Sequence, residues 1–107
     1  MNTDFITETA LCNAAVNVVA AKPEFAKIMD SAGEEQTFAF GALLSVIFTP
    51  FVSDLERVPY YVAYRRAMSD IAPLEMDDFM MAMVDELTKV GGDLGAKTRA
   101  RKTCNVL

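Results

Sequence analysis

The stretch QTFAFGALLSVIFTPFVS, residues 36–53, decides the fold because it carries no charged side chain. Its apolar residues do not alternate with polar ones, so a half-buried β-strand is disfavoured. Pro50 interrupts the run and shortens its unbroken apolar part. An uncharged stretch of about 18 residues lies at the boundary between a membrane span and a buried helix. We favour a central core helix over Gln36–Phe48, with a membrane span as the alternative.

Helix-forming segments precede this run. The segment from about Asp4 to Ala21 is rich in alanine and places apolar residues at helical spacing. A short second helix is expected to begin at Pro23, because proline suits the first helical position. It ends by Gly33, since glycine favours helix termination. Two helices are therefore expected before the central one.

Prolines divide the chain after the central run. Ser53 begins a capping-box sequence, but Pro59 follows so soon that residues 50–57 are expected to form a turn or a short helix. Pro59 is then expected to begin a new helix that ends before Pro73. The segment Leu74–Val90 is the clearest amphipathic helix. Its apolar stripe consists of Met76, Phe79, Met80, Met83, Val84, Leu87 and Val90.

These patterns predict an all-α fold. A chain of 107 residues with 52% apolar side chains has enough material for one core. We expect a single small helical domain of four to six helices around the central apolar helix, followed by a short basic C-terminal tail.

The net charge of −5 conceals a strong polarity along the chain. Residues 1–93 hold all fifteen acidic and six of the ten basic side chains, a balance of −9, whereas residues 94–107 hold four basic side chains and no acid. We therefore divide the chain into an acidic helical domain, 1–93, and a basic tail, 94–107. The tail can contact an anionic partner or fold back on its own body. Its expected contact residues are Lys97, Arg99, Arg101 and Lys102.

Several kinds of catalytic site lack their usual residues in this sequence. There is no histidine, so no Ser-His or Cys-His nucleophile pair can form. Cys12 and Cys104 alone cannot supply a zinc site, and no glycine-rich phosphate loop occurs. The acid pairs Asp77-Asp78 and Asp85-Glu86 lie opposite the apolar stripe and are interpreted as solvated. We expect a cytoplasmic protein with free thiols, without enzymatic activity, cofactor or metal.

Tyrosine and arginine gather in one short segment. All three tyrosines of the chain lie there, and two arginines follow them directly. Tyrosine and arginine dominate the energetics of protein–protein contacts. They also stack on single-stranded nucleic acid, but the negative charge around them favours a protein. The predicted partner-binding residues are Tyr60, Tyr61, Tyr64, Arg65 and Arg66.

The last four residues, Cys104-Asn105-Val106-Leu107, resemble a C-a-a-X prenylation box. The resemblance implies that Cys104 carries a lipid and that the preceding basic residues provide the second membrane signal. Asn105 departs from the aliphatic residue that is usual at its position. The alternative function is therefore a membrane-associated protein, anchored by Cys104 or inserted through segment 36–53.

The sequence predicts a non-enzymatic protein–protein interaction or assembly protein: an adaptor, a structural component or a small inhibitor of a larger complex. The expected partner is another protein or protein complex, or a second copy of the chain. Nucleic acid is disfavoured as a partner except at the basic tail, although the acidic body could occupy a nucleic-acid channel by mimicking phosphate charge. A membrane is the second choice.

Overall fold

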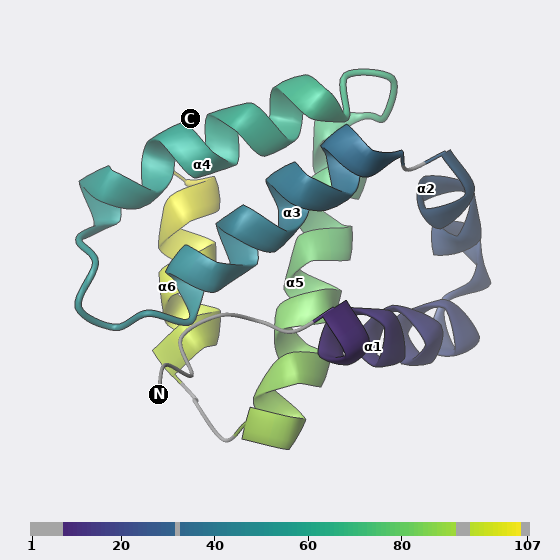
Figure 1. The fold of residues 1–107 in the computed structure, drawn as a ribbon, viewed down its shortest axis with the longest axis horizontal. Coiled ribbons are helices and arrows are strands. Elements are labelled where there is room, and N and C mark those ends of the chain that lie inside the picture. The colour runs from purple at the N-terminus through teal and green to yellow at the C-terminus, as the bar shows by residue number, and fades with distance from the viewer. Residues whose placement is uncertain (1–7, 32, 92–94, 106–107) are drawn as a thin grey trace.

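A computed structural model describes residues 8–31, 33–91 and 95–105 and shows an arrangement of helices (Figure 1). The predicted all-α class is confirmed, and the described residues include six α-helices and no strand. The elements are α1 (Glu8–Ala21), the 3₁₀ turn η1 (Pro23–Phe25), α2 (Ala26–Ser31), α3 (Glu34–Ile47), α4 (Asp54–Ala67), α5 (Pro73–Gly91) and α6 (Gly95–Cys104).

Helices α3 and α4 lie side by side and run in opposite directions, as expected for helices joined by a short connection (Figure 1). Helix α5 crosses this pair, with α1 packed against it on one side and α6 on the other. Helix α6 also packs against α4 and α3. The described helices therefore form one body, in which α5 connects the outer elements.

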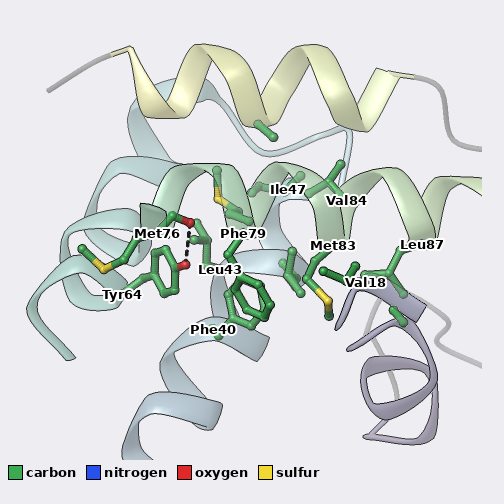
Figure 2. Packing of buried hydrophobic residues seen from close by; sticks show 14 of the residues in the cluster. Val18, Phe40, Leu43, Ile47, Tyr64, Met76, Phe79, Met83, Val84 and Leu87 are labelled. Carbon is green, nitrogen blue, oxygen red and sulfur yellow. Dashed lines mark hydrogen bonds between the residues drawn. The ribbon is translucent and has the colours of Figure 1, made fainter. Parts of the chain in front are cut away.

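The core lies where α3, α4 and α5 meet, and three aromatic rings form its middle (Figure 2). The ring centroid of Phe40 lies 5.1 Å from that of Tyr64 and 5.3 Å from that of Phe79. Phe25 meets Phe79 edge to face at 5.4 Å, which is favourable for aromatic pairs. The predicted stripe of the Met-rich helix is buried here from Met76 to Leu87.

The uncharged run is helical only over its first part, because α3 ends at Ile47. Its buried residues lie on the side of the core, as a central core helix requires: Phe40, Leu43, Leu44 and Ile47. Among the helices that the structure describes, none has the length and apolarity that a membrane span requires.

The expectation that a helix begins at Pro59 was wrong, because α4 runs unbroken from Asp54 to Ala67. The Ser53 side chain caps its start, as the capping-box sequence predicted. The Ser53 hydroxyl accepts a hydrogen bond from the Glu56 N–H at 3.2 Å and donates one to the Glu56 carboxylate at 3.0 Å. A proline inside a helix costs about 3 kcal/mol, so capping and the contacts of α4 must together exceed that cost.

One of these contacts is made by Arg57, whose side chain is only 2% exposed. Its guanidinium donates to the carbonyls of Val46 and Thr49, each at 2.9 Å, and to the Asp54 carboxylate at 2.8 Å. The last carbonyls of a helix lack intrahelical partners, and the helix end carries partial negative charge. Arg57 therefore closes the carboxyl end of α3 from the first turns of α4.

The residues predicted to form a basic tail include helix α6, which is folded back on the body, one of the two arrangements expected for this segment. Ala96, Ala100 and Thr103 face inward and are buried. The Arg99 side chain donates to the carbonyl of Ile47 at 2.6 Å, so it is a second cation at the end of α3. The predicted boundary at residues 93–94 lies outside the described residues. Within the described part, α6 is an integral element of the fold.

Replacing Arg57 with alanine is expected to lower the free energy of unfolding by about 3 kcal/mol. It removes the short side-chain hydrogen bonds to the carbonyls of Val46 and Thr49, which then keep only backbone hydrogen bonds of 3.4 and 3.3 Å, and it removes the bond to the Asp54 carboxylate. Urea unfolding followed by circular dichroism measures the change. Arg66→Ala, at an exposed arginine of the same helix, is the matched control and should change stability by no more than about 0.5 kcal/mol. Equal stabilities of the two variants would contradict this role of Arg57.

Candidate functional site

The five predicted partner-binding residues all lie on α4, but the structure divides them between core and surface. Tyr61 and Tyr64 are fully buried, so the expectation that they contact a partner is corrected. Arg65 is half-buried, whereas Tyr60 and Arg66 are exposed. Residues three and four apart share a helix face, and the inward face of α4 takes positions 57, 61 and 64. Only Tyr60 and Arg66 of the predicted set are fully available on the surface.

The two buried tyrosines have structural partners. The Tyr64 hydroxyl donates to the carbonyl of Met76 at 2.8 Å, and the Tyr61 hydroxyl donates to the Asp77 carboxylate at 2.5 Å. Arg65 lies 5.7 Å from the centre of the Tyr61 ring, within cation–π range. The two hydrogen bonds join α4 to α5, and they give both hydroxyls a partner inside the core.

Cys104, the predicted lipidation site, lies beside Tyr61 and Asp77, where α4, α5 and α6 meet. Burial raises the pKa of this thiol to about 12, and the negative charge of Asp77 adds to the effect. The thiolate is the nucleophile in cysteine chemistry, so Cys104 is expected to react slowly near neutral pH. Residues 106–107 of the prenylation-like box lie outside the described residues, so lipidation stays a prediction.

The four predicted tail contacts also divide. Lys97 forms an ion pair with Asp85 of α5, and this contact lowers the pKa of that carboxyl. Arg99 donates to the end of α3, as described above. Arg101 and Lys102 are exposed on the last turns of α6. Two of the four cations thus act within the fold, and two remain on the surface.

The exposed residues of α4 take part in a groove that the sequence did not reveal. It lies between α3 and α4 and has a volume of about 460 Å³. Its lining includes Glu35, Phe38, Ala42, Tyr60, Ala63 and Arg66. Phe38 is 78% exposed and Tyr60 42% exposed, which is unusual for large aromatic side chains of a folded domain. An exposed apolar surface rimmed by polar groups is typical of a binding site.

Phe38 was missed because the whole uncharged run was assigned to the core. The helical spacing of the run contained the signal. Positions 38 and 42 lie four apart and share a face, whereas the buried positions 40, 43, 44 and 47 form another. Without knowing which face meets the core, the sequence could not tell the two faces apart.

Neither a metal cluster nor a relative adds information about this surface. Within the described residues, no three His, Cys, Asp or Glu side chains lie where they could hold a metal ion. Comparisons with protein-family models, curated proteins and solved structures find no match to this chain. The geometry of the groove is therefore the basis for a functional proposal.

The fold is expected to lose stability above about pH 9. Burial raises the pKa of Tyr61, Tyr64 and Cys104 above their ordinary values, which are 10.0, 10.0 and 9.0. Below about pH 9 these groups are protonated in both states; above it they ionise in the unfolded chain first. Stability then falls as the pH rises toward about 12, by about 1.4 kcal/mol per pH unit for each titrating group.

Urea unfolding between about pH 8 and pH 11 measures this slope. The variant Tyr64→Phe removes one of the three titrating groups. It should be less stable than the wild type at pH 8, because it loses the hydrogen bond to Met76, and its stability should fall less steeply with pH. An unchanged slope in this variant would contradict the assignment to Tyr64.

The two cysteines are expected to differ in reactivity. Cys12 is exposed on α1, whereas Cys104 is half-buried with a raised pKa, so iodoacetamide at pH 8 should alkylate Cys12 at least about tenfold faster. Mass spectrometry of the peptides measures both rates. The variant Asp77→Asn removes the nearby negative charge and should accelerate Cys104 while leaving Cys12 unchanged. Equal rates of the two wild-type thiols would overturn this expectation.

Proposed function

We propose that this chain is a non-enzymatic protein-binding protein and that its contact surface is the groove between α3 and α4. The observation that carries the proposal is the exposure of Phe38 and Tyr60 on two neighbouring helices, with Arg66 beside them. Aromatic and arginine side chains supply most of the energy at protein interfaces. The exposed part of the predicted Tyr-Arg segment thus contributes to one continuous surface with α3.

The shape and chemistry of the groove support an amphipathic helix of the partner as its occupant. Small side chains line it between the aromatic ones, including Ala39, Ala42 and Ala63, and leave room for apolar side chains to enter. Partner helices commonly dock in this way, with apolar residues three and four apart in a groove between two helices. Glu35 and Arg66 supply opposite charges among the lining residues, which can orient such a helix.

The ionisable groups at the groove favour binding over catalysis. The described lining residues include three: Glu35, Tyr60 and Arg66. The lining residues include no cysteine, serine, threonine or lysine, so the groove lacks the nucleophiles that enzymes use most often. The apolar character of the remaining lining residues fits the desolvated centre of a protein interface.

The proposal is tested by capture from the native host with the immobilised protein, followed by quantitative mass spectrometry. The variant Phe38→Ala/Tyr60→Ala/Arg66→Ala should capture at least about tenfold less of any specific partner. Truncating each residue that anchors an interface lowers the binding free energy by more than about 1–2 kcal/mol. Circular dichroism establishes that the variant is folded, which is expected because all three side chains are on the surface.

A matched control removes three exposed apolar side chains outside the groove: Phe51→Ala/Leu55→Ala/Leu74→Ala. This control should retain the partner. If the folded groove variant captures the partner as well as the control does, the groove is not the contact surface and the proposal fails.

A further inference from the structure

A second concave site lies at the other side of α3, and it differs from the groove in depth and chemistry. It is a cavity of about 160 Å³ bounded by residues of α1, α2, α3 and α5. Its inner wall is made of side chains that are themselves buried in the core, including Ile28, Phe40, Phe79 and Met83. Core packing is therefore incomplete at this place, and a space open to a ligand remains.

The lining of the cavity is almost entirely apolar. Its polar side chains are Gln36 and Thr37, together with the weakly polar thiol of Cys12. A water molecule inside a protein needs two to four polar partners, and an apolar cavity of about 150 Å³ in another protein stays dry and binds benzene. The volume and the lining thus point to an uncharged apolar molecule of similar size.

The side chains facing the cavity suit an aromatic ring in particular. Phe40 and Phe79 can meet a ring edge to face or in an offset stack. Met29, Met68 and Met83 add flexible thioethers, which adapt to irregular shapes and make favourable contacts with aromatic edges. This combination allows the wall to close around a ring without a change in the backbone.

The cavity has an entrance on the surface. Three lining residues of the cavity are exposed: Cys12, Met29 and Thr37. A ligand can therefore enter beside α1 without unfolding of the core. A shallow apolar groove of about 500 Å³ shares Cys12, Ala15 and Met29 with the cavity and continues along α1 past Val16 and Val19. A short aliphatic substituent on the ring would lie there.

We propose that the cavity between α1, α2, α3 and α5 binds an uncharged aromatic molecule of about the size of benzene, with a short aliphatic chain extending into the α1 groove. This site is separate from the groove between α3 and α4 and does not depend on the protein-binding proposal. Benzene and butylbenzene are suitable probes, because they differ only in the chain.

Nuclear magnetic resonance of the full chain tests the proposal. Benzene should give intermolecular nuclear Overhauser effects to the methyl groups of Ile28, Met68 and Met83, and a saturable shift of these signals. Butylbenzene should bind at least about tenfold more tightly, because several methylene groups are removed from water. The absence of contacts to these methyl groups, or contacts only to exposed side chains such as Leu74, would overturn the proposal.

Two variants probe the cavity from different sides. Ala15→Leu fills it from α1, and Thr37→Trp covers its entrance from an exposed position that does not disturb the core. Both should weaken benzene binding at least about tenfold. The control Val16→Leu, in the outer groove only, should leave benzene binding unchanged. If Ala15→Leu fails to fold, Thr37→Trp decides, and unchanged benzene affinity in Thr37→Trp counts against the site.

Discussion

The carboxyl end of α3 is enclosed by two other helices, and its last carbonyls accept short hydrogen bonds from side chains elsewhere in the chain. Arg57 of α4 and Arg99 of α6 supply them. Desolvation by burial lowers the pKa of Arg57, and the nearby positive charge of Arg99 lowers it further. The partial negative charge of the helix end and the Asp54 carboxylate offset this repulsion. Three helices are joined at this point, and the positions of α4 and α6 against the core follow from it.

The uneven charge of the sequence has a role inside the molecule as well as on its surface. The basic segment after residue 93 can contact an anionic partner or fold back on the acidic body. In the structure Lys97 pairs with Asp85, and Arg99 binds the end of α3. The polarity along the chain thus helps to hold α6 on the body. Of the four predicted tail contacts, Arg101 and Lys102 are the two that stay fully exposed to an external partner.

The sequence predicted the helical class, the approximate limits of the central helix and the buried stripe of α5, because apolar spacing and missing charges act locally. It failed where a distant contact decides. Pro59 suggested a helix start, but the Ser53 cap and the bonds of Arg57 outweigh that local preference. The orientation of α4 decides that Tyr61 is buried and Tyr60 exposed, and this depends on the position of α5. The cavity near α1 has no sequence signal, because it results from imperfect packing among separate elements.

The hydrogen bond from Arg99 to the end of α3 can form only late in synthesis. Arg99 lies 52 residues beyond Ile47, whose carbonyl it binds. A ribosome adds about 5–20 residues per second, so the helix exists as a nascent segment for roughly 3–10 s before this donor is made. Helix α5, which covers the aromatic face around Phe40, is also made within this interval. Slow translation of the stretch after Ile47 therefore delays the formation of the contacts that cover the apolar helix α3.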